Sequence, residues 1–535
     1  MASIDNVVRP VGSLAKFNTA RNSLGILRAV IVTCRYRVST AHLRHRSLSL
    51  HDAVENALAA VILGQAMLRV GIAGEDTKEP VFVDLKTIDM RRMIEWEEVI
   101  ITPAPASHSH SEGDKGGKSE EERREEAHHE DRLLRSLEKH HQAPWDDLAN
   151  KPGWKIVVHH DPRQLSSLRS SDSDAELSLD VSFCFHHAYA DGKGGYIFHG
   201  ALRRALDTGA RPAELQKHIL QLPASAVLPP PMEKLIPFRL SWAFVLRTAW
   251  AEILYPVLVP AFLRRLLRLE PSDAEIPWTA RPIDASNQTM HLCTLFRIDD
   301  EAQLRRILVR CRGHTASLTG LLHALVARSL VRVVEGRSLR STTPIALAGY
   351  ADPDIAGAAF TPGGTIHCLV TSLACGYDRD ALRPLRQGLD EHGSRVEDDA
   401  AVWAFARDMT ARLRAKAASL PRDDIVALSG LVGDWHDFFR RKFGKPRDAS
   451  WELSNLGSLG VADAGSEEEG GWFIDRAVFT QGGNPTSGAL NVNVAGVAGH
   501  GIYVTVSWQE GIVNAGLVEE VAGDLRTWFA KLEAS

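Results

Sequence analysis

Alternating apolar and polar residues mark one β-strand of the chain with particular clarity. In 175–185, AELSLDVSFCF, every second residue is large and apolar. Residues two apart lie on one face of a strand, so these side chains are expected to form a buried face. They are Leu177, Leu179, Val181, Phe183 and Phe185. Other apolar runs predict strands at 25–37, 80–84, 97–102, 154–160, 290–298, 472–481, 490–497 and 502–508.

Apolar residues spaced three and four apart predict the helices. In 51–72 the positions Val54, Leu58, Val61 and Ile62 fall on one face of a helix. Similar spacing predicts helices at 196–206, 317–334, 398–419 and from 518 onward. Strands and helices are mixed in both halves of the chain, so we expect a mixed α/β (α+β) protein. Its two domains are expected at 1–275 and 285–535.

A polar segment interrupts the N-terminal half. Residues 103–126 are mostly Ser, Gly, Glu, Lys and His, so burial cannot offset the entropy lost on ordering them. We therefore expect a disordered insertion there. His128, His129, His140 and His141 lie beyond it among acidic residues. A charged helical face is favoured for them over a metal site.

The most apolar stretch of the chain, 241–263, is long enough to span a bilayer. Arg247, Glu252, Pro256 and Pro260 interrupt it, and such residues are uncommon in transmembrane helices. Three interpretations stay open, in this order of preference: a buried helix or tunnel lid, a peripheral membrane contact, and a true span.

The composition is that of a soluble globular protein, with 44% hydrophobic and 24% charged residues among 535. A net charge of −5 argues against nucleic acid held by bulk electrostatics. Six cysteines without a CxxC pair indicate reduced thiols, and the N-terminus lacks the pattern of a signal peptide. We expect a cytoplasmic protein without a nucleic-acid partner, membrane-peripheral if 241–263 makes contact.

The candidate chemistry follows the alternating strand, in the sequence HHAYADG at 186–192. The His187 imidazole can take a proton from a hydroxyl, because the ordinary pKa of histidine is about 6.5. Asp191 can hold the loop by binding a cation or backbone groups. On the residues alone, histidines that only satisfy hydrogen bonds at a strand end are an equally good interpretation.

Three glycines follow the aspartate. Gly192, Gly194 and Gly195 are expected to permit a sharp turn and the close approach of another backbone. Neither a GxSxG elbow nor an HExxH motif occurs in the sequence. A serine nucleophile and metal catalysis therefore find little support.

HHAYADG resembles the HHxxxDG signature of the CoA-dependent acyltransferase superfamily. That group includes chloramphenicol acetyltransferase, plant BAHD acyltransferases, peptide-synthetase condensation domains and fungal alcohol acetyltransferases. WELSNLG at 451–457 resembles the SNLG segment of the alcohol acetyltransferase and condensation-like branches. FTQ at 479–481, VSWQEG at 506–511 and the opening RPVGSLAKFNTAR at 9–21 are similar to the fungal branch. The resemblance covers nearly the whole chain, although the plant DFGWG motif is absent.

The resemblance implies two chloramphenicol-acetyltransferase-like domains with the active-site tunnel between them. His187 matches the general base that deprotonates the acceptor hydroxyl, and His186 matches the less critical first histidine. Asp191 matches a residue that faces away from the substrate and pairs with an arginine. Ser454 and Asn455 are candidate donors to the oxyanion or, equally, part of a turn between strands.

The function so implied is O-acyl transfer, most simply from acetyl-CoA to the hydroxyl of a small alcohol or secondary metabolite. Direct attack in a ternary complex is expected, in a monomer with no bound cofactor or metal. The sequence does not single out the residues that bind CoA. Two rivals stay open: a condensation-type acyl or amide transferase with a carrier-protein-bound donor, and a non-catalytic binding protein that retains the fold.

Overall fold

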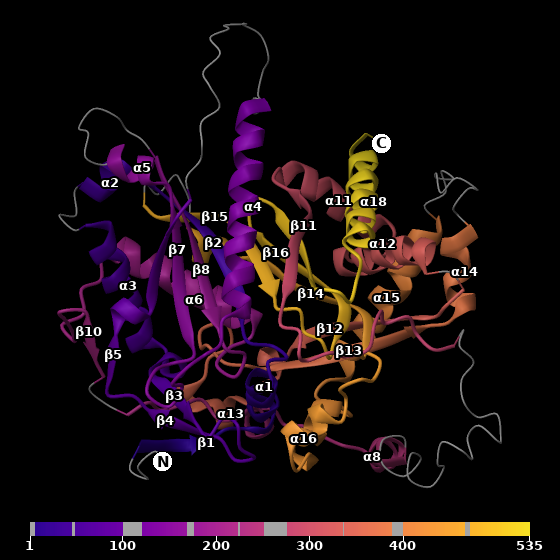
Figure 1. Cartoon of the computed structure of the whole chain (residues 1–535), viewed down its shortest axis with the longest axis horizontal. Coiled ribbons are helices and arrows are strands. Elements are labelled where there is room, and N and C mark those ends of the chain that lie inside the picture. Colours follow the sequence, from indigo (N-terminus) through magenta and orange to yellow (C-terminus); the bar gives the residue numbers. More distant parts are fainter. Residues whose placement is uncertain are drawn as a thin grey trace, which may run out of the picture.

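The chain folds around two β-sheets that lie side by side, each covered by helices (Figure 1). Each sheet has its own hydrophobic core, and the expected mixture of strands and helices is confirmed. The structure is a computed structural model that describes residues 6–44, 49–99, 120–167, 176–222, 225–250, 275–334, 336–387, 400–465 and 471–534.

The N-terminal sheet has five strands in the order β15-β2-β8-β7-β6. They are β15 (Phe473–Gln481), β2 (Val30–Ser39), β8 (Glu176–Phe185), β7 (Trp154–His160) and β6 (Ile94–Glu98). The alternating apolar residues of β8 are buried in one core, as predicted. That core is shared with the helices α3 (Leu50–Gly64) and α6 (Gly192–Thr208).

The C-terminal sheet has six strands in the order β11-β17-β16-β14-β12-β13. They are β11 (Met290–Ile298), β17 (Ile502–Gln509), β16 (Gly488–Val497), β14 (Ala449–Leu459), β12 (Leu339–Ala346) and β13 (Val370–Tyr377). Four helices share its core: α11 (Glu301–Gly313), α12 (Leu318–Val333), α15 (Ala400–Ser419) and α18 (Ala515–Ala534).

One strand connects the two sheets. β15 comes from the C-terminal half of the chain but pairs antiparallel with β2, with Phe479 opposite Val32. Backbone hydrogen bonds therefore hold the two halves together. The domain division at 1–275 and 285–535 stays a prediction, and β15 is the strand that crosses it.

Short elements complete the described chain. One three-stranded sheet contains β1 (Val7–Pro10), β4 (Val81–Asp84) and β3 (Val70–Ala73). Another contains β5 (Thr87–Asp89), β10 (Ile219–Gln221) and β9 (Leu215–Gln216). The remaining helices are α1 (Ser13–Ser23), α2 (Thr40–Arg44), α4 (Glu120–Gln142), α5 (Pro162–Ser167), α7 (Met232–Leu235), α8 (Trp242–Ala249), α13 (Pro353–Ala356), α14 (Arg379–Gln387), α16 (Trp435–Arg440) and α17 (Val461–Ala464).

Two predicted elements have different bounds in the structure. The helix expected at 51–72 ends at Gly64, because the backbone of Gln65 is extended and 70–73 pairs with β4 instead. The strand expected at 97–102 begins earlier, at Ile94, where it pairs in parallel with Ile156 of β7.

Of the polar segment 103–126, residues 103–119 lie outside the described residues. Residues 120–126 form the first part of helix α4. Glutamate and arginine are good helix formers, and they dominate 120–126. Arg297 of β11 donates to Glu126 Oε2 at 2.9 Å and to Glu130 Oε2 at 3.1 Å. For 120–126 the expected disorder is therefore wrong, because these residues belong to a helix that is bound to the C-terminal sheet.

The histidines of α4 do not form the charged outer face that we expected. His128 is exposed, but His140 and His141 are buried between α4 and the N-terminal sheet. His141 contacts Ala29 O at 3.1 Å and Thr480 Oγ1 at 2.8 Å. Burial lowers the pKa of His141 to about 3, so this imidazole is neutral.

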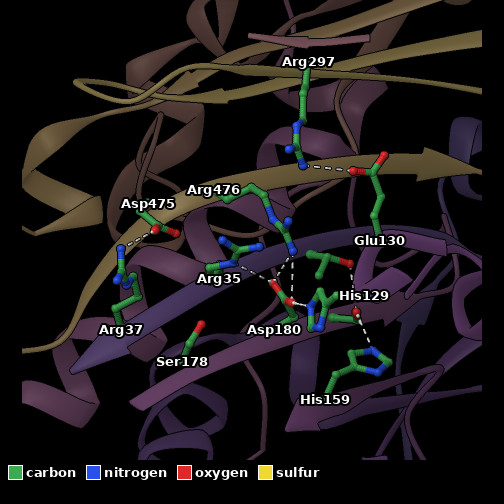
Figure 2. Close-up of polar contacts among 12 residues, drawn as sticks. Arg35, Arg37, His129, Glu130, His159, Ser178, Asp180, Arg297, Asp475 and Arg476 are labelled. Carbon is green, nitrogen blue, oxygen red and sulfur yellow. Dashed lines mark hydrogen bonds and ion pairs between the residues drawn. The ribbon is translucent and has the colours of Figure 1, made fainter. Parts of the chain in front are cut away.

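Asp180 of β8 is the centre of a buried polar network beneath α4 (Figure 2). Its carboxylate accepts two 3.0 Å hydrogen bonds from Arg476 and contacts His129 at 2.5 Å. Burial by itself would raise the pKa of Asp180, but Arg476 and His129 outweigh it and hold the pKa well below its usual range. The network fixes α4 against the sheet, while Arg297 fixes it to the other half.

None of the described helices is by itself long and apolar enough to cross a membrane. α11 and α12 meet that criterion only as a pair, and the pair is bent by 86°. In the stretch 241–263, α8 has no buried residue, with Trp242 81% and Leu246 66% exposed. The buried-helix interpretation is therefore wrong for α8, while 251–263 lies outside the described residues. Membrane contact stays a prediction.

Candidate active site

His187 lies on the turn between β8 and α6, and its Nδ1 is 2.9 Å from the carbonyl oxygen of Ala190. A carbonyl only accepts hydrogen bonds, so Nδ1 carries the proton and Nε2 keeps its lone pair. Burial, and to a lesser degree the charge of Arg21, lowers the pKa of His187 to about 4. At neutral pH the side chain is a neutral imidazole with a free basic nitrogen.

Two residues from distant parts of the chain hold this turn. Asn18 of α1 donates through Nδ2 to the carbonyl oxygen of His187 at 3.3 Å and contacts Cys368 Sγ at 3.6 Å. Cys368 Sγ is also 3.6 Å from His187 Nδ1. Burial raises the pKa of the Cys368 thiol well above its usual value, so it stays protonated. Sequence reasoning did not single out these residues, although Asn18 lies in the opening motif at 9–21.

A small cavity borders the same turn. Its walls include Ala188, Cys368, the apolar Leu14 and Phe82 and the charged Arg9 and Glu233. Ala188 follows His187 directly and Cys368 contacts its imidazole. The cavity beside the turn therefore presents both apolar and charged groups.

His186 has a different environment. It is fully buried, its Nδ1 accepts a hydrogen bond from the backbone N–H of Ala188 at 2.9 Å, and its Nε2 is 2.7 Å from Glu75 Oε1. Because Nδ1 accepts, Nε2 carries the proton and donates to Glu75. Both ring nitrogens are engaged, so His186 supports the turn and leaves the free nitrogen to His187.

Asp191 caps the N-terminus of α6. Its carboxylate accepts a hydrogen bond from the backbone N–H of Gly194 at 2.9 Å. It accepts a second one at 3.0 Å from the backbone N–H of Leu369, which precedes β13 of the C-terminal sheet. Burial raises the pKa of Asp191, and the backbone hydrogen bonds limit that rise. Among the described residues no arginine forms an ion pair with Asp191, so two backbone amides take the place of the arginine that the resemblance implies.

The three glycines begin α6 and do not form a sharp turn. None of them has a positive φ. A Cβ would lie 2.3 Å from Leu456 Cδ2 at Gly192, and 2.4 Å from Val32 Cγ2 at Gly195. The close approach is therefore made by side chains and not by the backbone that we expected, and it brings α6 against both β2 and the SNLG segment.

We expect Gly195→Ala to lower the free energy of unfolding by about 1–3 kcal/mol through overpacking. The added methyl would meet Val32 of β2, a neighbour within a packed core. Urea unfolding followed by tryptophan fluorescence measures the change. Gly376→Ala is the control, because no heavy atom lies within 4 Å of a Cβ there. Equal unfolding midpoints for both variants would contradict the tight packing.

The SNLG segment lies at the end of β14, against the start of α6. Lys193 Nζ donates to Leu456 O at 2.5 Å, and the Tyr196 hydroxyl donates to Gly457 O at 3.0 Å. Asn455 donates to Thr319 Oγ1 at 3.0 Å and accepts the N–H of Gly457 at 2.7 Å. The two motifs, far apart in sequence, therefore meet.

Ser454 precedes this turn. It is buried in β14 and lies in register with Asn493 of β16. The amide of Asn455 is occupied by the turn itself. Of the two candidate oxyanion donors, Ser454 is therefore the one whose side chain the turn does not use.

One group in the described chain has metal-ligand spacing. Atoms of Glu95, Glu97 and His140 lie within 4.8 Å of one another. Lys155 donates to Glu95 at 2.8 Å and Lys139 to Glu97 at 3.0 Å. The lysines already balance the negative charges of both carboxylates. The group lies where α4 packs on the N-terminal sheet, and not at the turn that carries His187.

The chain has relatives along almost its whole length. It is 28% identical over 535 residues to the probable alcohol acetyltransferase FCK4 of Fusarium pseudograminearum, covering 98% of this chain and 96% of the relative. The probable alcohol acetyltransferase crmB of Aspergillus fumigatus is 23% identical over 539 residues, covering 98% and 99%. The chain is a homologue of these fungal proteins. No protein-family model matches it.

Solved structures show the same fold. The trichothecene 15-O-acetyltransferase TRI3 of Fusarium sporotrichioides matches with a TM-score of 0.62 and 11% identity, over 98% of this chain and 94% of the other. The condensation domain of the polyketide synthase MokA matches with a TM-score of 0.51 and 12% identity, over 98% and 97%. The chain thus has the two-domain fold of chloramphenicol-acetyltransferase-like enzymes, and its homologues support an acyltransferase activity.

Proposed function

We propose that the protein transfers an acyl group, most simply acetyl, from acetyl-CoA to the hydroxyl of a small alcohol or secondary metabolite. The observation that carries the proposal is the 2.9 Å contact between His187 Nδ1 and the carbonyl oxygen of Ala190. The Ala190 carbonyl holds the proton on Nδ1, which leaves Nε2 free to act as a base. The fungal homologues, named as probable alcohol acetyltransferases, support the same reaction class.

The proposed reaction needs one base and no covalent enzyme intermediate. Nε2 of His187 takes the proton of the acceptor hydroxyl while the oxygen attacks the thioester carbonyl carbon. The tetrahedral intermediate then collapses, the carbon–sulfur bond breaks, and the sulfur of CoA receives the proton from His187. In this scheme Ser454 is the candidate donor to the oxyanion, and Asp191 and His186 hold the loop.

Release of free CoA thiol from acetyl-CoA, measured across a panel of alcohols, tests the reaction class. Alcohol-dependent release supports the proposal. A protein that binds CoA without releasing thiol with any acceptor, but that transfers an acyl group from a carrier protein, would favour the condensation-type rival. Binding of an alcohol without turnover from either donor would favour the binding protein.

The low pKa of His187 predicts the pH dependence of the rate. Only the unprotonated imidazole can accept a proton, so activity is lost as the pH falls through the pKa of the base. With that pKa at about 4, kcat/KM should be nearly constant from neutral pH down to about 5 and fall below it. Profiles of kcat/KM between pH 3.5 and 8, with circular dichroism at each pH, check this. An acid limb centred near the ordinary histidine value would contradict it.

A further inference from the structure

Four arginines are buried in the part of the chain that the structure describes: Arg21, Arg203, Arg447 and Arg476. Two of them have a carboxylate partner, since Arg203 pairs with Asp207 and Arg476 with Asp180. Neither Arg21 nor Arg447 has a described carboxylate within 4.0 Å. Because a buried charge is costly without a counter-charge, these two arginines stand apart from the others.

Both unpaired arginines contact the same turn. Arg21 donates through Nη2 to Asn484 Oδ1 at 2.7 Å, and Arg447 donates through Nη1 to Pro485 O at 2.7 Å. Arg447 Nη2 also donates to Gln509 Oε1 at 2.6 Å. In each guanidinium Nε is buried with no hydrogen-bond partner in the described chain. Two guanidinium groups without a direct carboxylate partner, each with an unused Nε–H, therefore contact two consecutive residues of one turn.

More distant carboxylates act on both arginines: Glu452 and Asp448 on Arg21, and Asp284 on Arg447. Burial lowers the pKa of Arg21 and of Arg447 to about 10, and the more distant carboxylates only partly offset it. Arg21 also donates through Nη1 to Asn18 Oδ1 at 3.2 Å, and Asn18 in turn binds the backbone of His187. The turn is thus linked to the backbone of the proposed base through two side chains, Arg21 and Asn18.

The same turn lines a shallow pocket between the two halves of the chain. Its walls include Arg28, His141 and Asn484, and none of its lining residues is an aspartate or glutamate. Arg21 and Arg447 do not line the pocket but lie behind the turn that does. Arg28 is partly exposed in the wall. Positive charge held in a low-dielectric interior extends into the nearest opening, so the pocket favours an anion.

We infer that the Asn484–Pro485 turn, backed by Arg21 and Arg447, is a binding site for an oxyanion group of a substrate. The chemistry fits a phosphate or a carboxylate, because Arg28 in the wall can donate hydrogen bonds to either anion and the charges of Arg21 and Arg447 lie behind the turn. A phosphate would come from the acyl-CoA, and a carboxylate from the acceptor. This choice of sources rests on the proposed function, whereas the affinity for an anion does not.

Titration calorimetry with CoA, dephospho-CoA and pantetheine distinguishes the phosphate source, using wild type and Arg447→Gln. We expect the variant to bind CoA at least about ten-fold more weakly and to bind pantetheine, which lacks phosphate, equally well. Arg447→Lys keeps the charge and should retain most of the affinity. Arg340→Gln removes one exposed arginine of β12 and should change nothing. Thermal unfolding without ligand shows whether each variant is folded.

A second arm tests the carboxylate source. If CoA affinity is unchanged in Arg447→Gln, acetylation of 3-hydroxybutyrate relative to 2-butanol should fall about ten-fold instead, which assigns the site to the acceptor. Folded variants with unchanged CoA affinity and an unchanged acceptor ratio overturn the inference and leave the proposed function standing.

Inorganic phosphate tests the anion site without requiring any acetyl transfer. A rise in the unfolding temperature of wild type with phosphate, absent in Arg447→Gln, supports the anion site even if no acetyl transfer occurs. In that case the proposed function fails alone. Wild type that responds neither to phosphate, nor to CoA, nor to the hydroxy acid overturns the site.

Discussion

Replacing His187 with alanine is expected to lower kcat by about 100- to 10,000-fold, the usual contribution of a positioned general base. The variant loses the only group that we assign to proton transfer. Its fold should survive, because the imidazole is partly exposed and its only hydrogen bonds in the described chain are to Ala190 O and Cys368. Thiol release from acetyl-CoA with an excess of alcohol measures the loss.

His128→Ala provides the matched control. It makes the same chemical change on an exposed position of α4, so it should keep wild-type activity. The unfolding temperature of both variants should stay within a few degrees of wild type. If folded His187→Ala keeps more than about one tenth of the wild-type kcat, another group takes the proton and the assignment of the base is wrong.

The strand and the motif that carries the candidate base could be predicted because their signals are local. The alternation of 177–185 depends only on the pleat of one strand, and it places His186 and His187 directly at the strand end. The helix after the motif follows from the apolar spacing of 196–206. These features need no knowledge of the rest of the chain.

The partners of His187 could not be predicted in this way. Asn18 and Cys368 are 169 and 181 residues away in sequence, and the pattern of their own segments does not indicate where they pack. The partners of Asp191 are harder still. A backbone amide such as that of Leu369 has no residue-type signature, so the sequence favoured an arginine that the described structure does not place there.

The buried face of α4 shows a second limit of pattern analysis. Hydrophobic periodicity assumes that a buried face is apolar, but the strand faces under α4 carry Asp180 and Thr480 beside an apolar cluster that includes Leu137. His140 and His141 therefore point inward and satisfy polar groups. A buried helix face that combines leucines with histidines therefore resembles a solvated helix in the sequence.

Asp191→Ala is expected to lower the free energy of unfolding by about 2–4 kcal/mol, because it leaves two buried N–H groups without an acceptor. These belong to Gly194, in the first turn of α6, and to Leu369, next to Cys368. The same carboxylate therefore caps the helix and ties the turn at His187 to the segment before β13. Urea unfolding followed by tryptophan fluorescence measures the loss.

Asp191→Asn distinguishes the hydrogen bonds that the side chain accepts from the effect of its negative charge. The asparagine oxygen can keep one of the two hydrogen bonds, and the variant no longer buries a charge, so the loss of stability should be about half that of alanine or less. Activity should follow stability in both variants, with kcat reduced most in Asp191→Ala, where His187 is held least firmly. A stable asparagine variant without activity would mean that the negative charge acts on the reaction itself. Because the carboxylate is bound by amides of α6 and of the segment before β13, and not by His187, we expect the opposite result.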